Sequence, residues 1–217
     1  MAKERIILLG SGGHAMIVLD ILEEMRKFDI IGVVTKDALN NKTFMGYKIL
    51  GNDDVLSELY QQGIKKIAIG IGGFKNNSLR KKIFLKIKKM GFHAITAIHP
   101  RAIISKTVKI GEGSVIFPGV VINSSAKIGD NVIIATGSTV DHNTIIGNHV
   151  LISAGVTVGA DNIINEEALL ALGSKVVSGI TIGSDVLIGA GAVVVKDCLA
   201  PGIYLGIPAR KVTRKVK

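Results

Sequence analysis

The stretch IGDNVIIATGSTVDHNTIIGNHVLIS, residues 128 to 153, carries an aliphatic residue at every sixth position. The same spacing runs from Ile98 to Val194, where all seventeen positions are Ile, Val or Leu. A period of six cannot form one face of an α-helix, whose side chains recur at about 3.6 residues. Hexapeptide periodicity is typical of a β-helix, in which three short strands close a coil of eighteen residues. This half of the chain is therefore predicted to be a triangular prism with an aliphatic core.

At one position that recurs every eighteen residues, glycine follows the aliphatic residue in four coils, and the one coil that lacks glycine there has Asn165. We expect these positions to be prism corners that need a positive φ angle, which glycine and asparagine tolerate. Aromatic residues make up only 4% of the chain and Trp is absent, as a narrow prism requires. The four glycines are Gly111, Gly129, Gly147 and Gly183.

The first half of the chain alternates strand and helix patterns. Apolar runs at 5–10, 30–34 and 65–71 are typical of buried parallel strands, and residues 16–25 have helical spacing. A second helix is expected from Ser78 to Met90, with Ile83, Phe84 and Ile87 turned inward. The pattern predicts a Rossmann-like domain over 1–94, a β-helix over 95–199 and a basic tail over 200–217.

Composition narrows the classes of function. The net charge is +10, but no aromatic residues alternate with the basic ones, so we expect no nucleic-acid partner. The single Cys excludes an intramolecular disulfide framework and a zinc thiolate cluster, and we expect no metal. We find no apolar run of about 18 residues and no signal-peptide pattern, so we predict a cytoplasmic protein without a membrane span. Small polyanions such as coenzyme A or a sugar nucleotide suit the positive charge.

The segment GSGGHA, residues 10 to 15, has two interpretations. Its glycine spacing satisfies the dinucleotide fingerprint, with Asp37 loosely placed for a ribose contact, which would favour an NAD-binding dehydrogenase. Alternatively, it is a phosphate-binding turn at the N-terminus of a helix, where free N–H groups meet an anion.

The order of motifs along the chain resembles that of a known family. GSGGHA, the βαβ pattern, IHPRAIIS, VDHNTIIG, VLIGAGAVVVKD and a closing GIPARKV occur in sequence. The chain resembles the sialic-acid O-acetyltransferase and nucleotide-aminosugar N-acetyltransferase (bacillosamine-type) group of left-handed β-helix, hexapeptide-repeat acyltransferases. The resemblance implies a nucleotide sugar on the N-terminal domain, a homotrimer, and acetyl-CoA between adjacent prisms.

The resemblance also implies roles for single residues. His142 falls on the general base, and imidazole suits removal of a proton near neutral pH. Its neighbours Asp141 and Asn143 are candidates for orienting the ring. A plain surface turn is the alternative interpretation of this polar segment. Relatives commonly carry a second histidine where this chain has Leu151, and we expect His149 to lie on another face.

Further positions follow from the same resemblance. The nucleotide diphosphate and sugar are expected at Gly12, Gly13, His14, Asp37, Gly70 and Asn77. Acetyl-CoA is expected at Gly155, whose N–H group could hold an oxyanion, and at Leu151, Leu172, Gly173, Ala190, Gly191 and Arg210.

Together these observations predict an acetyl-CoA-dependent N-acetyltransferase. Its acceptor would be the amino group of a nucleotide-linked sugar, such as a 4-amino-4,6-dideoxy sugar, used for bacterial surface glycans. O-acetylation of sialic-acid-like sugars is the nearest alternative. A dehydrogenase and a non-catalytic scaffold that binds sugar nucleotides are alternatives of other classes.

Overall fold

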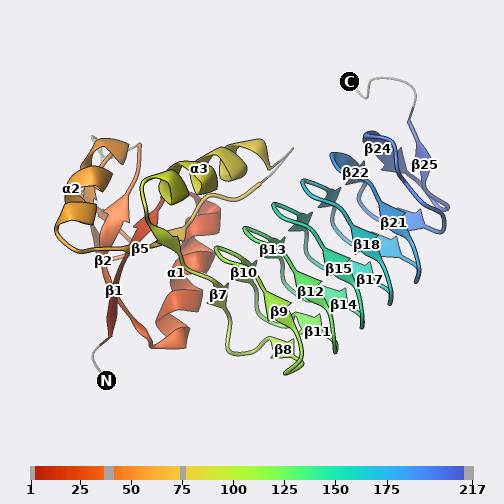
Figure 1. Ribbon diagram of the computed structural model, residues 1–217, viewed down its shortest axis with the longest axis horizontal. Helices are drawn as coiled ribbons and strands as arrows, with labels where there is room; N and C mark the ends of the chain where they lie inside the picture. The colour runs from red at the N-terminus through yellow and green to blue at the C-terminus, as the bar shows by residue number, and fades with distance from the viewer. Residues whose placement is uncertain (1–2, 37–41, 74–76, 213–217) are drawn as a thin grey trace.

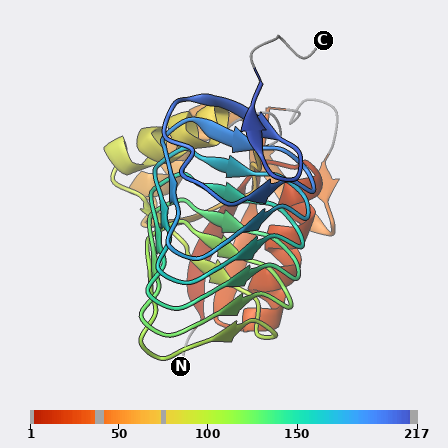
Figure 2. The same ribbon diagram turned by 90° about the vertical axis from the view of Figure 1, so that its right-hand side faces the viewer.

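The computed structural model describes residues 3–36, 42–73 and 77–212. An α/β domain packs beside the first coils of a β-helix, whose later coils step away from that domain (Figure 1). Seen from its far end, the β-helix is a stack of superposed coils with α3 along one side (Figure 2). Within these ranges, no helix is long and apolar enough to cross a membrane.

A six-stranded sheet forms the N-terminal domain. Its order is β3-β4-β2-β1-β5-β6, and all neighbours are parallel except β3 and β4. The central strand is nearly continuous in aliphatic residues because both faces of the sheet are covered. The strands are β1 (Glu4–Leu9), β2 (Phe28–Val34), β3 (Thr43–Phe44), β4 (Tyr47–Gly51), β5 (Lys66–Ile69) and β6 (His93–Ala94).

Among its described residues, this domain contains three helices and one 3-10 turn, and the sequence predicted two of the helices, over residues 16–25 and 78–90. The helical elements are α1 (Gly13–Met25), the 3-10 turn η1 (Asp53–Val55), α2 (Leu56–Gln61) and α3 (Ser78–Lys89). The second predicted helix is confirmed, and it buries Phe84 and Ile87 while Ile83 is half-buried. It also buries Arg80, a charged residue that hydrophobic periodicity alone would place outside.

Seventeen short strands, β7 to β23, build the β-helix. Each strand ends on one of the seventeen predicted aliphatic positions, which point inward, and neighbouring strands pair in parallel eighteen residues apart. The first face contains β7 (Ala97–Ile98), β10 (Val115–Ile116), β13 (Ile133–Ile134), β16 (Leu151–Ile152), β19 (Leu169–Leu170) and β22 (Val186–Ile188). The second face contains β8 (Ile103–Ile104), β11 (Val121–Ile122), β14 (Thr139–Val140), β17 (Thr157–Val158), β20 (Lys175–Val176) and β23 (Val193–Val194). The third face contains β9 (Lys109–Ile110), β12 (Lys127–Ile128), β15 (Ile145–Ile146), β18 (Ile163–Ile164) and β21 (Thr181–Ile182).

The corners have a strict backbone signature. Every sixth residue from Gly113 to Gly191 has a positive φ, fourteen in all within the described residues, and half of them are not glycine. The prediction that Gly111, Gly129, Gly147, Gly183 and Asn165 take this conformation is wrong, because none has a positive φ. These glycines serve close approach instead. A β-carbon on Gly147 would lie 2.7 Å from the Glu166 nitrogen of the next coil.

The segment expected to be a basic tail is largely part of the β-helix. β24 (Gly202–Leu205) extends the first face parallel to β22, and β25 (Arg210–Lys211) returns antiparallel to it. Tyr204 and Ala209 are buried there, which explains why a Lys- and Arg-rich stretch is ordered. In the structure β6 ends at Ala94 and β7 begins at Ala97, and two further strands, β24 and β25, follow residue 199. The division of the chain into domains at 94 and 199 stays a prediction.

The corners stack into three edges, which we name by their contents. The glycine edge joins the first and second faces and contains Gly119, Gly137, Gly155, Gly173 and Gly191. The histidine edge joins the second and third faces and contains residues 105–108, 123–126, 141–144, 159–162, 177–180 and 195–198. The helix edge joins the third and first faces and contains residues 111–114, 129–132, 147–150, 165–168 and 183–185.

Coil stacking gives a test of the glycine correction. We expect Gly147→Ala to lower the free energy of unfolding by about 1–3 kcal/mol, the usual cost of overpacking. Gly179→Asn adds a larger side chain at a left-handed corner, where a β-carbon would meet no described atom within 4 Å. It should cost much less. Urea denaturation of both variants decides the matter, and equal losses would contradict the stacking explanation.

Candidate functional site

A pocket of about 250 Å³ opens at the carboxyl ends of β1 and β2, beside the start of α1. Its lining includes Ser11, Gly12, Thr35 and Lys36, and the hydroxyls of Ser11 and Thr35 lie 2.7 Å apart. The strand β1 lies between β2 and β5, so the chain order reverses there, where ligands of open parallel sheets bind. This pocket is the candidate site for a nucleotide.

The start of α1 matches the interpretation of GSGGHA as an anion-binding turn. Gly12 is the N-cap and Gly13 the first helical residue; both are exposed, and a β-carbon on either would meet no described atom within 4 Å. The first turn has no acidic residue to occupy its N–H groups. Gly70 has a different environment, since its β-carbon would lie 2.7 Å from that of Ala15. Asp37 lies outside the described residues.

His14 faces the β-helix instead of the pocket lining. Its ring stacks on Phe117 with centroids 5.7 Å apart, and its Nε2 lies 3.4 Å from Nη1 of Arg80. Burial, and then the charge of Arg80, lower the pKa of His14 to about 3. The imidazole is therefore neutral at physiological pH and contributes to the joint between the domains.

Arg80 is the central polar group of that joint. Its guanidinium donates to the carbonyl oxygens of Ile69 (3.1 Å) and Ile71 (2.6 Å) in the N-terminal domain. It also donates to the carbonyl oxygen of Gly113, 2.9 Å away in the first coil. Desolvation lowers the pKa of this fully buried side chain to about 9. One side chain thus bonds the end of the parallel sheet to the start of the β-helix.

Asn77 and His149 belong to the same joint. The amide of Asn77 donates to the His149 carbonyl oxygen at 2.6 Å, and Asn77 is 4% exposed. The ring of His149 lies against Phe84 and bonds to Asn131, and burial lowers its pKa. His149 is therefore on the helix edge, away from His142, as the sequence predicted. The predicted contact of Asn77 with substrate stays a prediction.

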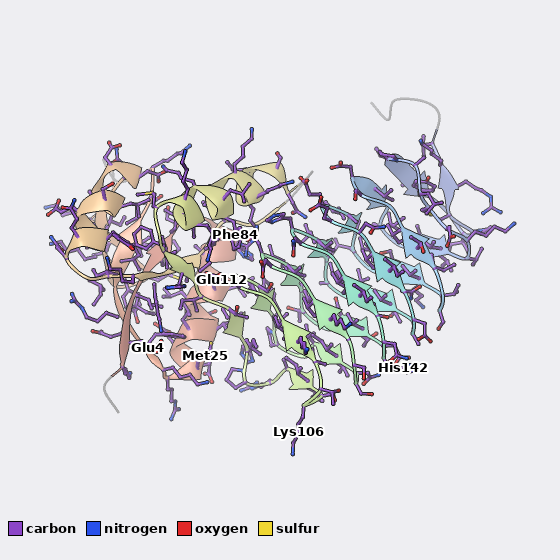
Figure 3. All side chains as sticks on the ribbon, viewed as in Figure 1. Glu4, Met25, Phe84, Lys106, Glu112 and His142 are labelled. Carbon is purple, nitrogen blue, oxygen red and sulfur yellow. The ribbon has the colours of Figure 1, made fainter. Side chains whose placement is uncertain are left out.

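His142 stands exposed at the histidine edge, between β14 and β15. In Figure 3 it lies at the side of the β-helix opposite α3. The carboxylate of Asp141 accepts from the main-chain nitrogen of His142 at 2.7 Å and from the side chain of Asn123 at 2.8 Å. Both bonds, that with Asn123 first, lower the pKa of Asp141. Asp141 thus shapes the corner, and its predicted bond to the imidazole ring stays a prediction.

The glycine edge is free of side chains along its left-handed positions. Gly119, Gly137, Gly155, Gly173 and Gly191 follow one another at that position in five coils, whereas the other two edges also use Ser, Asn, Asp, His and Glu. A β-carbon on Gly173 or Gly191 would meet no described atom within 4 Å, so packing inside the chain does not require glycine. The glycine edge therefore leaves room for a ligand or another protein chain to approach the backbone closely.

The other predicted acetyl-CoA residues divide between exposed and buried positions. Leu172 and Ala190 are exposed beside Gly173 and Gly191. Leu151 is on the first face and only 7% exposed. Arg210, in β25, lines a pocket of about 240 Å³ with Lys196 and Lys211. Among the described residues, no group of three His, Cys, Asp or Glu side chains could hold a metal ion.

The predicted site residues therefore lie in three separate places on one chain. The second face separates His142 from the glycine edge, and the nucleotide pocket lies in the other domain. Sequence reasoning missed Ser11, Thr35 and Lys36 in the pocket and Asn123 beside Asp141. The pair Asn123 and Asp141 could have been found, because polar residues eighteen apart stack directly.

The neutral His14 predicts a pH dependence of stability. Between pH 6.5 and about 3 the unfolded chain binds a proton at residue 14 that the folded chain does not, so stability falls as pH falls. We expect His14→Gln to flatten this slope by up to about 1.4 kcal/mol per pH unit. Denaturant titrations at pH 7, 6 and 5 measure it. An unchanged slope in His14→Gln would refute the prediction.

Comparisons with known proteins find relatives of both the N-terminal domain and the β-helix. Residues 5–87 match the PglD N-terminal domain family, and residues 107–142 and 125–160 match the bacterial transferase hexapeptide family. UDP-N-acetylbacillosamine N-acetyltransferase of Bacillus subtilis is 32% identical over 118 residues, which cover 52% of this chain and 51% of that relative. The match thus spans about half the length of this curated relative.

Two solved structures match over nearly the whole chain. PerB from Caulobacter crescentus, in complex with CoA and GDP-perosamine, is 34% identical with a TM-score of 0.89, covering 97% of this chain and 98% of PerB. The acetyltransferase domain of PglB from Neisseria gonorrhoeae, in complex with acetyl coenzyme A, is 28% identical with a TM-score of 0.87 and covers 97% and 100%. The chain therefore belongs to the sialic-acid O-acetyltransferase and nucleotide-aminosugar N-acetyltransferase (bacillosamine-type) family of left-handed β-helix, hexapeptide-repeat acyltransferases, which its motifs predicted.

Proposed function

We propose that the protein transfers an acetyl group from acetyl-CoA to an amino group of a nucleotide-linked sugar. The observation that carries the proposal is the combination of a pocket at the carboxyl ends of the parallel strands, a side-chain-free glycine edge and an exposed corner histidine in one chain. PerB, solved with CoA and GDP-perosamine, supports the same pairing of ligands. Both ligands are metabolites of the cytoplasm, which we propose as the place of the reaction.

His142 is the proposed general base. In the reaction the amine nitrogen attacks the thioester carbonyl and loses a proton to the imidazole. The C–S bond then breaks, and the imidazolium gives its proton to the leaving sulfur, so that CoA is released as a thiol. An exposed ring on a rigid corner can receive that proton directly, and the N–H of Gly155 is the proposed donor to the oxyanion. The corner column supports this role, since the adjacent coils have the small residues Ser124 and Ala160 at its position.

Loss of the imidazole should abolish turnover without loss of the fold. We expect His142→Ala to lower kcat by about 10²- to 10⁴-fold, the usual contribution of a general base. Free CoA released from acetyl-CoA and a panel of UDP-, dTDP- and GDP-aminosugars measures it. Lys106→Ala is the matched control, because Lys106 stands at the same corner position two coils away (Figure 3). Normal turnover by His142→Ala would eliminate the proposed base.

Acetyl-CoA is proposed to lie along the glycine edge, between copies of the chain in a homotrimer. One chain does not bring its glycine edge to its own His142, because the second face lies between them. A closed ring of three prisms would place the glycine edge of one subunit against the histidine edge of the next. The shared site would then take its base from one subunit and its acetyl-CoA surface from another.

Mixed subunits test this arrangement. Gly173→Asn keeps a residue that tolerates a positive φ but adds a side chain to the edge, so we expect its KM for acetyl-CoA to rise about tenfold or more, from loss of one close contact. When the two variants are co-expressed, some sites combine the intact His142 of a Gly173→Asn subunit with the intact glycine edge of a His142→Ala subunit. These sites should restore activity at low acetyl-CoA. Steady-state kinetics on doubly tagged, co-purified oligomers measure the recovery.

Gly63→Asn is the control for the glycine change. Gly63 also has a positive φ and open space where a β-carbon would stand, but it lies in the turn between α2 and β5. Its KM should equal that of the wild type. If the co-purified oligomers show no recovery, or their mass is not three times that of the 22.9 kDa chain, the shared site is wrong.

A further inference from the structure

Hydrogen bonds that join two side chains of neighbouring coils flank His142 on the described part of the histidine edge. Along the described histidine edge, two pairs of side chains hydrogen-bond from one coil to the next. Asn123 bonds to Asp141 at 2.8 Å, and Asn143 bonds to Asp161 at 2.9 Å. Asp141 and Asn143 are the two residues that flank His142 in the sequence. Within the described part of this edge, the position with such bonds on both sides is thus that of the proposed base.

The corner of His142 is held from the following coil at two points by one residue. The main-chain N–H of Asp161 donates to the His142 carbonyl oxygen at 3.0 Å. This first bond recurs at other corners, as between Gly179 and Ala160, and is a property of the fold. The second is particular to this corner, because the Asp161 carboxylate accepts from the Asn143 side-chain amide.

We propose that Asp161 is a positioning residue for His142, which it holds through Asn143. The carboxylate anchors the amide of Asn143 toward the following coil and so fixes the peptide between residues 142 and 143. The direction of the His142 Cα–Cβ bond follows from that peptide, and small displacements of a catalytic group can cost large factors in rate. The inference rests on the proposed function of His142 as base, and it assigns Asp161 no contact with substrate.

The neighbouring coils suggest variants that preserve the backbone. Asp161 has a φ of 56°, and the same column contains Asn143 one coil before and Gly179 one coil after. Asp161→Gly therefore removes the acceptor without backbone strain, and Asp161→Asn keeps an acceptor oxygen without the charge. Ser125→Gly, in the same column two coils before Asp161, is the matched control.

Kinetics separate positioning from a general structural role. We expect Asp161→Gly to lower kcat about tenfold, which corresponds to about 1.4 kcal/mol in the barrier, because the base is less well placed. KM for both substrates should stay within twofold and Tm within a few degrees. Asp161→Asn should recover most of the loss, and Ser125→Gly should match the wild type. An unchanged kcat in Asp161→Gly, or a loss that Ser125→Gly reproduces, would overturn the proposal.

A second readout does not depend on activity. In ¹H–¹³C spectra of histidine-labelled protein, the His142 ring should give one sharp set of signals in the wild type and in Asp161→Asn. Asp161→Gly should shift or broaden that set and leave the signals of the other four histidines in place. If the wild type acetylates no acceptor, the proposed function fails, but these spectra still test whether Asp161 holds His142 in place. A His142 signal that is unchanged in Asp161→Gly would refute the positioning role of Asp161.

Discussion

The whole β-helix depends on one repeated hydrogen bond at its corners. At every sixth residue the chain adopts a left-handed conformation, which costs an ordinary L-residue roughly 1–2 kcal/mol. From Asn131 onward, the N–H of each such residue donates to the carbonyl oxygen of the residue nineteen positions earlier, as from Gly155 to Thr136. This bond fixes the turn and the stacking together. The register of the inward aliphatic column follows from it, because an extra or missing residue would break both.

A repeated corner leaves the side chains of each edge free to diverge. The helix edge uses Gly113, His149 and Glu167 to receive α3, which joins the two domains through Arg80, Asn77 and Lys81. The glycine edge has no side chains at its left-handed positions. The histidine edge carries His142. Three edges with the same backbone thus carry the contact between the domains, the proposed approach of acetyl-CoA and the proposed base, and the fold is the same at all three.

The periodic features were predictable from the sequence because they follow from local spacing. The seventeen inward positions, the helix from Ser78 and the separation of His149 from His142 all follow from counting residues. The four glycines after the aliphatic positions were assigned the wrong physical reason. A glycine excluded by the atoms of the next coil and a glycine with a positive φ look identical in sequence, and only the three-dimensional stacking separates them.

The contacts between domains were not predictable in this way. The family resemblance predicts Asn77 and His14 as substrate-binding residues, but it does not indicate the partners that they have in the structure. These are His149, Phe117 and Arg80, far along the chain or in the other domain. A single sequence contains no information on which polar residue meets which surface after docking. Pairs eighteen residues apart are the exception, because the coil length places them in contact.

The column that contains His142 shows how stacking at eighteen residues shapes a candidate site. At successive coils it contains Lys106, Ser124, His142, Ala160, Ser178 and Lys196. The small side chains directly before and after His142 leave the imidazole without a large neighbour, so it stays exposed on a corner that is rigid. The flanking columns contain the polar pairs that tie this corner to both adjacent coils. The backbone is the same at each coil of this edge. His142 therefore differs from the other residues of its column through the side chains around it.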